Sequence, residues 1–362
     1  REFVKSLLTM ASYDEIMEEL EEIEEILPLF PVRGRKIFSQ RIDYFNIMGD
    51  EEFQNRFRLS KNTFVFLHSR IEGRIMNNSD RNNAISSQCK LMLALRMYAT
   101  GSMVLAVSDF IGISVGSACR CLHQVSLAIS SLRNEYIKMP SGAEVARCQQ
   151  KFYNVAKFPR VIGAVDCTHI KIQSPGGADA EVFRNRKGYF SLNVQTVSGP
   201  DAEICDIVSR WPGSSHDQTI FCNSVLVNRF ESQEFGNSLL LGDSGYRNRP
   251  YLVTPLQNPQ SRGENLYNES HIRTRNVVER SYGIWKRRFP ILRLEMRFKL
   301  QRVMPIIVAT AILHNMCLRH ADVDPSSTEE IDEGQVPCLP TSTGHDECGT
   351  REMLIHLYFN KM

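Results

Sequence analysis

The spacing of hydrophobic positions changes near residue 160 and predicts two kinds of structure. From residue 53 to about 132, apolar residues recur at helical steps of three and four, with breaks near residues 77–83 and at Gly101 and Gly112. From residue 161 onward, short β-branched runs are closed by turn residues, which is typical of strands. The predicted strands cover residues 161–172, 190–198, 203–210, 239–241 and 252–255.

Helices are predicted between and after these strands. Residues 217–230, 276–289 and 303–318 show helical periodicity. Strands followed by covering helices favour a mixed α/β sheet over a β-sandwich. We therefore predict an α/β fold, a mixed sheet flanked by helices, with an all-helical N-terminal module in front of it.

The two ends of the chain are acidic. Residues 14–25 carry eight carboxylates and no Lys or Arg, and their apolar spacing predicts a solvated helix over residues 13–26. Residues 321–350 carry eight more carboxylates among Ser, Thr and Pro, a composition typical of a disordered tail that ends in an amphipathic stretch. The predicted domains are an acidic extension (1–52), a helical module (53–150), the sheet domain (151–320) and the acidic tail (321–362).

A strongly basic segment lies between these ends. The formal net charge is only +2, yet residues 271–302 contain ten Lys or Arg and two Glu. A basic segment bounded by acidic ends points to a polyanionic partner. We predict that Arg280, Lys286, Arg287 and Arg288 contact nucleic acid.

Residues 107–120 show the residue pattern of a helix-turn-helix motif. Gly112 permits a tight turn, and Ser117, Arg120 and Gln124 are expected to lie outward on the second helix, where they would contact DNA. An ordinary helical hairpin with a buried second helix explains the same pattern. Spacing alone leaves both interpretations open.

Cysteine usage and hydropathy bear on the compartment. The ten cysteines contain no Cys-x-x-Cys pair and are expected to be reduced thiols in an intracellular protein. The longest apolar run, residues 304–317, is too short for a membrane span and includes Pro305 and His314. We expect no membrane segment.

Four acidic residues are candidates for a functional site because they interrupt, end or border the apolar pattern, or begin a predicted helix. Asp166 interrupts the apolar run 161–172, and burial of a lone carboxylate is costly unless it is paired or binds a cation. Asp243 ends the apolar run 239–241, and the carboxyl ends of strands face the ligand crevice in open α/β sheets. Glu279 lies inside the basic helix, beside the packing stripe of Val278, Tyr282, Trp285 and Phe289. Asp217 begins a predicted helix.

Three or four carboxylates from two strand ends and one helix suit Mg²⁺ or Mn²⁺, which prefer oxygen ligands. Such ions can activate water or a 3′-hydroxyl against a phosphodiester. Each acid also has a structural explanation: Asp166 as a paired core acid, Asp217 as an N-cap, and Glu279 as the partner of Arg275 one turn back. Their joint occurrence beside a basic helix favours the metal interpretation.

Several spaced blocks together resemble the PIF/Harbinger transposase superfamily and the Harbinger transposase-derived nucleases. The matching blocks are residues 163–170 (GAVDCTHI), 185–188 (NRKG), 211–217 (WPGSSHD), 240–246 (LLGDSGY), 276–280 (NVVER) with 286–289 (KRRF), and 313–315 (LHN). Thirty-five residues separate Asp243 from Glu279, the acid spacing associated with this DDE class. The resemblance covers roughly residues 53–320.

The resemblance implies an RNase H-like catalytic domain whose acidic triad is Asp166, Asp243 and Glu279, with Asp217 as a further metal ligand. It implies a divalent cation, Mg²⁺ or Mn²⁺, as cofactor, and cleavage or strand transfer on DNA. It also implies a separate Myb/SANT-like protein that helps bring the catalytic protein to DNA and into the nucleus, so we expect a location in nucleus and cytoplasm. Homo-oligomerisation is a further expectation.

Three functions are compatible with these residues. The first is a divalent-metal-dependent DNA endonuclease or transposase. The second is a domesticated DNA-binding or scaffold protein that keeps the fold and no longer cuts, and the presence of all the triad acids argues against it. The third is an RNase H-like hydrolase acting on RNA; the helix-turn-helix character near Gly112 favours duplex DNA.

Overall fold

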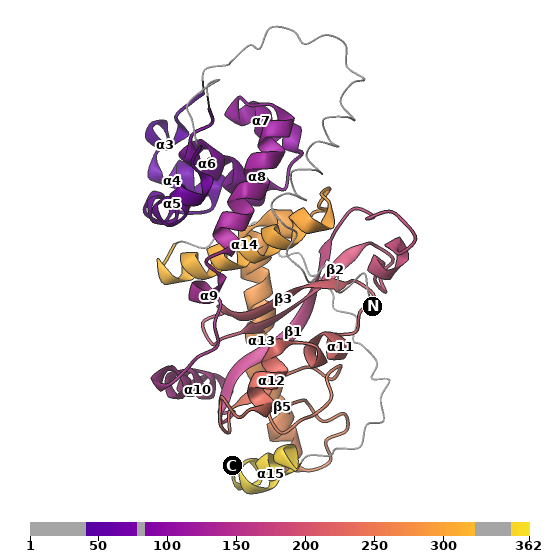
Figure 1. Cartoon of the computed structure of the whole chain (residues 1–362). Coiled ribbons are helices and arrows are strands. Elements are labelled where there is room, and N and C mark those ends of the chain that lie inside the picture. The colour runs from indigo at the N-terminus through magenta and orange to yellow at the C-terminus, as the bar shows by residue number, and fades with distance from the viewer. Residues whose placement is uncertain (1–40, 78–83, 323–348) are drawn as a thin grey trace. The chain divides into compact units, whose positions relative to one another are not determined.

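The first half of the described chain is helical, as the sequence predicts (Figure 1). The computed structural model describes residues 41–77, 84–322 and 349–362. Its helices before the sheet are α3 (Tyr44–Ile47), α4 (Asp50–Phe57), α5 (Lys61–Ile75), α6 (Ser87–Thr100), α7 (Val104–Ile111), α8 (Val115–Ser130), α9 (Arg133–Tyr136) and α10 (Ala143–Ala156). Ten residues of α6 are buried, because α4, α5, α7 and α8 all pack against it.

Helices α7 and α8 form the segment with helix-turn-helix texture. They meet at 95°, and Gly112 makes the turn with φ of 76°. Ser114 caps α8 by accepting a hydrogen bond from the backbone N–H of Ser117 at 3.3 Å. This geometry fits both a DNA-binding helix-turn-helix and an ordinary helical hairpin. DNA recognition by α8 therefore stays a prediction.

Five strands form one mixed sheet in the order β3-β2-β1-β4-β5, which confirms the predicted α/β, RNase H-like fold. The strands are β1 (Val161–Lys171), β2 (Ser191–Ser198), β3 (Ile204–Pro212), β4 (Leu239–Leu241) and β5 (Leu252–Val253). The first three strands are antiparallel neighbours, whereas β4 runs parallel to β1, and β5 runs parallel to β4. The short 3-10 helix η1 (Ala180–Phe183) lies between β1 and β2.

The helices after β3 begin and end differently from the prediction. The helix predicted over 217–230 is two helices, α11 (Asp217–Cys222) and α12 (Val225–Glu231), separated at Asn223. The helix predicted over 276–289 is the second half of α13 (Arg262–Arg288), a 27-residue helix that starts at a capping box formed by Ser261 and Glu264. The 3-10 helix η2 (Pro290–Leu292) follows it.

Helix α14 (Leu300–Arg319) packs against α8 on one side and β3 on the other, and Figure 1 shows it between the N-terminal helices and the sheet. It is long and apolar enough to cross a membrane, but 67% of its apolar window is buried inside the protein, as in the core helix of a globular domain. The described residues from Ile42 onward form one compact unit. The predicted domain boundaries stay a prediction.

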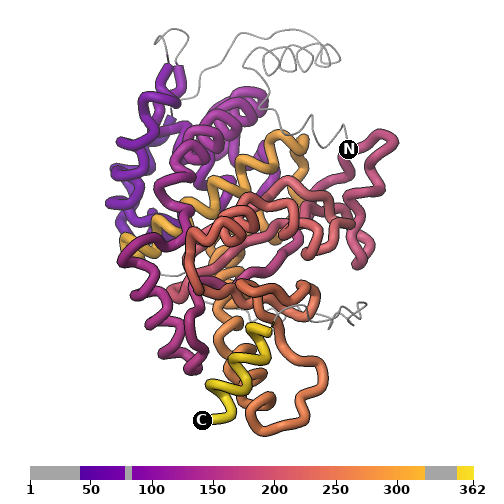
Figure 2. The backbone as a smooth tube through the Cα atoms, turned by 60° about the horizontal axis from the view of Figure 1, so that its bottom comes forward, coloured from indigo at the N-terminus to yellow at the C-terminus, as the bar shows by residue number. Residues whose placement is uncertain are grey.

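The chain end returns to the sheet domain. Helix α15 (Thr350–Leu357) and the 3-10 helix η3 (Phe359–Lys361) pack against α13, as the yellow end of the tube in Figure 2 shows. Leu354, Ile355 and Phe359 are buried there, which explains the amphipathic spacing of this stretch. The predicted helix over residues 13–26 and residues 323–348 of the predicted tail lie outside the described residues.

Candidate active site

Strand register brings Asp166 and Asp243 to the same level of the sheet. Ala164 of β1 pairs with Leu241, the last residue of the parallel strand β4; Asp166 lies two residues further along β1, and Asp243 lies two residues beyond the end of β4. Gly163 leaves room for both neighbouring strands, because a Cβ there would lie 2.4 Å from Cγ1 of Val197 on β2 and 3.1 Å from Cδ2 of Leu240 on β4. Asp166 and Asp243 therefore lie near each other, where the short strand β4 ends beside the middle of β1.

Helix α13 brings Glu279 to the same place through Arg275. The Nη1 of Arg275 donates to Oδ2 of Asp166 at 2.9 Å, and its Nη2 donates to Oε1 of Glu279 at 2.7 Å. One turn further on, the hydroxyl of Tyr282 donates to the backbone carbonyl of Asp166 at 2.7 Å. Arg275, Glu279 and Tyr282 are spaced by four and three residues, so one face of α13 covers the middle of β1.

Asp217 reaches the site from the start of α11. Its Oδ1 accepts a hydrogen bond from Nδ2 of Asn193 at 2.8 Å, and the same Nδ2 donates to the carbonyl of Ser215 at 2.9 Å. Asn193 lies on β2 opposite His169 of β1. The N-cap residue of α11 is His216 and Asp217 is the first residue of the helix, so Asp217 is not the N-cap that the sequence left open.

Mutual electrostatic effects show that the aspartates form one cluster. Burial raises the pKa of Asp166 to about 7, with Arg275 opposing the shift. The neighbouring charges of Asp243 and Asp217 add to the rise in the pKa of Asp166. Burial also raises the pKa of Asp243, although its Oδ1 accepts a hydrogen bond from the backbone N–H of Gly245 at 2.9 Å.

Arg275 is the counter-ion of this cluster. Burial by itself lowers its pKa, but Asp166 and Glu279 together with Asp243 raise it overall. Its side chain is only 14% exposed, whereas that of Glu279 is 41% exposed. The sequence indicated the pair with Glu279 as a structural alternative; it gave no sign that the same guanidinium also binds Asp166, 109 residues away.

The acids suit a divalent cation in kind, because hard cations bind carboxylate oxygens. Their present arrangement does not: within residues 41–77, 84–322 and 349–362, no three His, Cys, Asp or Glu side chains are placed to hold a metal ion. Arg275 already binds an oxygen of Asp166 and one of Glu279. A metal ion bridging these acids would have to displace the guanidinium from them.

The residues predicted to read DNA on α8 differ in their surroundings. Arg120 is exposed and donates to the hydroxyl of Ser117 at 3.3 Å. Gln124 is bound inside the helical module, because its Oε1 accepts from Nζ of Lys90 at 2.9 Å and its Nε2 donates to the carbonyl of Arg74 at 3.1 Å. Gln124 would have to leave both contacts to reach a base. Ser117, Arg120 and Gln124 stay predicted DNA contacts.

Most of the basic side chains near the end of α13 are buried against other parts of the protein. Lys286 is 7% exposed and Arg288 1% exposed. The guanidinium of Arg288 donates to the carbonyls of Arg58 and Asp322, each at 3.4 Å. Arg287 is half-buried, and the exposed Arg280 donates to the carbonyl of Pro200. A phosphate contact by Lys286 or Arg288 therefore requires a rearrangement of this helix end.

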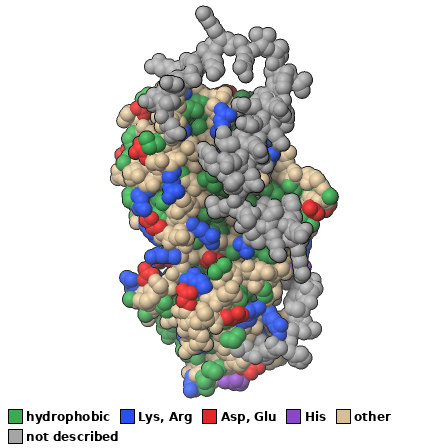
Figure 3. Space-filling model, viewed as in Figure 1, with side chains coloured by type: hydrophobic (Ala, Val, Ile, Leu, Met, Phe, Trp, Pro, Cys, Tyr) green, Lys and Arg blue, Asp and Glu red, His purple; other side chains and the backbone are tan. Residues whose placement is uncertain are grey.

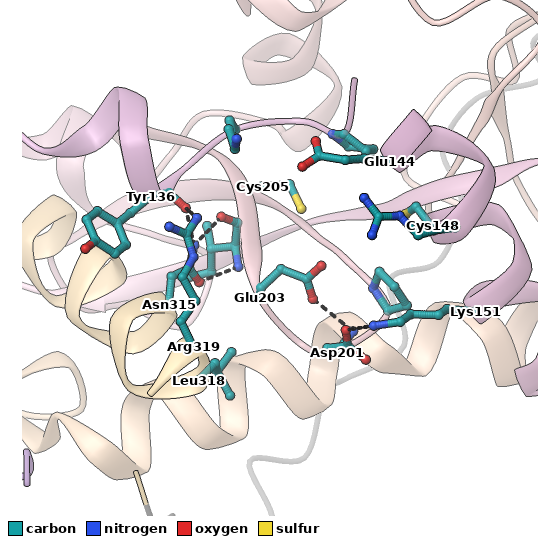
Figure 4. Close-up of a pocket in the computed structure, with 15 residues that line it drawn as sticks. Tyr136, Glu144, Cys148, Lys151, Asp201, Glu203, Cys205, Asn315, Leu318 and Arg319 are labelled. Atoms are coloured by element: carbon teal, nitrogen blue, oxygen red, sulfur yellow. Dashed lines mark hydrogen bonds and ion pairs between the residues drawn. The ribbon is translucent and has the colours of Figure 1, made fainter. Parts of the chain in front are cut away.

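A cavity away from the acids is a second place where a ligand could bind. It lies between α10, the β2–β3 connection and α14, and Figure 4 shows Glu144, Glu203 and Cys205 at its wall. Lys151 and Asp201 form an ion pair at its rim. None of Asp166, Asp217, Asp243 or Glu279 lines this cavity, so it is separate from the acidic cluster.

The fold and the cluster define the chain as an RNase H-like domain of the DDE type. The model of the DDE superfamily endonuclease family matches residues 165–315. The chain is 31% identical over 275 residues to HARBI1 of Homo sapiens, whose name proposes a nuclease function, covering 75% of this chain and 78% of that protein. The chain therefore belongs to the Harbinger transposase-derived nuclease family.

Other relatives agree with this assignment. HARBI1 of Xenopus laevis is 33% identical over 248 residues, 67% of this chain and 71% of that protein. The protein named ALP1-like of Arabidopsis thaliana is 25% identical over 310 residues, 79% of this chain and 75% of that protein. No solved structure matches the chain significantly.

Proposed function

We propose that this protein is a divalent-metal-dependent DNA endonuclease whose catalytic acids are Asp166, Asp243 and Glu279, assisted by Asp217. The observation that carries the proposal is the placement of Asp243 just after β4, beside the β1 strand that carries Asp166, with Glu279 joined to Asp166 through Arg275. Membership of a family with an endonuclease domain supports it. Mg²⁺ or Mn²⁺ bound by these carboxylates would supply a Lewis acid for the phosphodiester and a more acidic water.

The protein's own groups orient the acids. The hydroxyl of Tyr282 holds the backbone at Asp166, and the backbone N–H of Gly245 holds one oxygen of Asp243. Asn193 fixes one oxygen of Asp217. These contacts fix the carboxylates before substrate arrives, and such preorganisation is what a site for charge stabilisation requires.

Arg275 has two effects in this proposal. In the metal-free protein its guanidinium offsets the repulsion among the acids and holds Asp166 and Glu279 together. It also occupies carboxylate oxygens that a metal ion needs. Arg275 is therefore a positioning residue whose removal favours metal binding and weakens the metal-free fold.

The test is calorimetric titration of Mn²⁺ into the full chain and into Asp166→Asn and Asp243→Asn, followed by cleavage of duplex DNA with the same samples. Asp50→Asn is the matched control, because its side chain is 89% exposed on α4. We expect both site variants to lose Mn²⁺ binding and cleavage while the control retains both. Full activity in Asp166→Asn would remove this acid from the site.

A non-cutting DNA-binding protein is the second candidate. The observation that favours it is that Arg275 already pairs with both Asp166 and Glu279, so these two acids have a cationic partner without a metal ion. The same titration separates the two candidates. Wild-type protein that binds duplex DNA but no Mn²⁺, with or without that DNA, would establish the non-cutting function.

A further inference from the structure

A DNA-binding surface beside the acids requires Lys or Arg side chains that can reach phosphate groups. Most of the basic residues predicted for this role at the end of α13 are buried. Lys286 and Arg288 are buried. On the face drawn in Figure 3, Lys and Arg side chains are interspersed with acidic ones and form no single patch. A second element near the acidic cluster carries exposed cations.

This element is the turn over residues 185–188, and hydrogen bonds from a buried side chain fix its backbone conformation. The side chain of Asn185 is buried, and its Oδ1 accepts from the backbone N–H groups of Lys187 at 3.0 Å and Tyr189 at 3.3 Å. Its Nδ2 donates to the hydroxyl of Ser191 at 3.0 Å. Gly188 closes the turn with φ of 84°, in the left-handed region that favours glycine.

This construction places Arg186 and Lys187 at the tip of the turn, where both are exposed. Asn at the first position and Gly at the fourth are the residues that such a turn prefers. The sequence block NRKG therefore has a physical explanation: two residues shape the turn, and the two between them present positive charge.

The turn lies beside the acidic cluster. Nη2 of Arg186 donates to Nδ1 of His216 at 2.6 Å, and His216 directly precedes Asp217. Burial lowers the pKa of His169 on β1, and the charge of Asp217 opposes this shift. The charges of Lys286, Lys187 and Arg186 lower the pKa of His169 further, so the two turn cations act on the same small region as Asp217 and the buried Lys286.

We propose that Arg186 and Lys187 bind backbone phosphates of the DNA on which the acidic site acts, and so form the basic wall of the site beside Asp217. The inference rests on the proposed function for the identity of the polyanion. Arginine and lysine beside a carboxylate cluster supply the phosphate contacts that position a duplex without reading its sequence. The contact between Arg186 and His216 would let the turn and Asp217 engage the same strand.

The test measures binding of a fluorescent 30-base-pair duplex of mixed sequence by anisotropy, across a range of NaCl concentrations. The full chain carries Asp166→Asn throughout, so that DNA is bound and not cut. One variant adds Arg186→Gln and Lys187→Gln. The matched control instead adds Lys138→Gln and Arg147→Gln, which remove the same charge from exposed residues at the separate cavity.

We expect the turn variant to bind DNA about ten-fold more weakly at moderate salt, with a slope of log K against log salt that is shallower by about 2, since each phosphate contact contributes about 0.9. The control pair should change affinity less than about two-fold. Exchange of the two residues, Arg186→Lys with Lys187→Arg, keeps the charge and should retain binding.

Two results would overturn the inference: an equal loss in the turn and control variants, or an unchanged salt slope in the turn variant. A different result would overturn the proposed function. If the Asp166→Asn protein shows the turn-dependent binding but the wild type neither binds Mn²⁺ nor cleaves DNA, then phosphate binding by the turn stands and the nuclease proposal fails. If the Asp166→Asn parent binds no DNA, both fail.

Discussion

Two short basic runs, residues 286–288 at the end of α13 and residues 186–187 in the β1–β2 connection, are alike in sequence and different in the structure. Lys286 and Arg288 are buried, and Arg288 binds backbone carbonyls of Arg58 and Asp322. Arg186 and Lys187 are exposed at the tip of a turn beside Asp217. The longer run is more basic, yet the shorter one is more exposed.

The difference shows that tertiary packing, and not charge density, decides what a cation does. An arginine cannot lose its proton in a protein, so a buried guanidinium must find acceptors. At Arg288 the acceptors are carbonyls at the end of α4 and just after α14, and the side chain joins the helical module to α13. Arg288 supports the fold for that reason, whereas contact of Lys286 or Arg287 with DNA stays a prediction.

The largest expected effect is the loss of stability in Arg288→Ala. The change removes a buried side chain that packs and donates two hydrogen bonds, so the free energy of unfolding should fall by about 4 kcal/mol. Urea denaturation followed by circular dichroism measures it. Arg287→Ala is the neighbouring control and should cost about 1 kcal/mol or less. A stable Arg288→Ala protein with weakened DNA binding would return Arg288 to the DNA surface.

A second prediction concerns His271, a buried residue of α13 that, unlike arginine, can lose its proton and remain neutral. Burial lowers its pKa from 6.5 to about 4, and the interaction of its Nε2 with the carbonyl of Val253 opposes the shift. Between these two values the unfolded state binds more protons than the folded state. Stability therefore falls as the pH falls through this window, by up to about 3 kcal/mol.

Urea denaturation of wild type and His271→Gln from pH 7.5 to pH 4 checks this sign. Gln can keep a hydrogen bond to Val253 but does not titrate, so the variant should lose less stability than wild type on acidification. Parallel curves for the two proteins would show that other groups cause the acid sensitivity. The proposed difference between Arg288, which is buried in its charged form, and His271, which is buried in its neutral form, would then have no support.

The strands and the acids could be predicted from the sequence because their signals are local. Short apolar runs closed by turn residues located the five strands of the described residues, and Asp166 and Asp243 stood out because they interrupt or end apolar runs. The packing stripe of α13 was also visible: Val278, Tyr282 and Trp285 are buried, as the spacing indicates.

What the sequence did not reveal depends on distant contacts. The first half of α13 is polar and lacks a clear apolar stripe, although Ser261 and Glu264 match a capping box that could have located its start. The burial of Arg288 depends on Arg58, 230 residues away, and the bridge from Arg275 to Asp166 spans 109 residues. No periodicity along the chain encodes such pairs.

Arg275→Gln tests a third kind of cation, one paired with the acids themselves. Without the guanidinium, Mn²⁺ meets no competitor at Asp166 and Glu279, so we expect about ten-fold tighter binding, or about 1.4 kcal/mol. The calorimetric titration should be run at pH 8, because the pKa of Asp166 is about 7 and loss of Arg275 removes the charge that lowers it.

Arg273→Gln is the matched control, because Arg273 lies on the same helix and pairs with the exposed Glu269. It should leave Mn²⁺ affinity unchanged. Weaker binding in Arg275→Gln would mean that the guanidinium helps to assemble the metal site. Absence of Mn²⁺ binding in wild type and variant alike would count against the nuclease proposal itself.

The smallest expected effect on stability completes the comparison of the two basic runs. Arg186→Gln with Lys187→Gln should change the free energy of unfolding by no more than about 0.5 kcal/mol, because both side chains are exposed and Asn185 and Gly188 maintain the turn. The same urea series measures it. A loss near that of Arg288→Ala would show that the turn cations also support the fold, and the weaker DNA binding of that variant would then follow from a displaced turn and not from lost phosphate contacts.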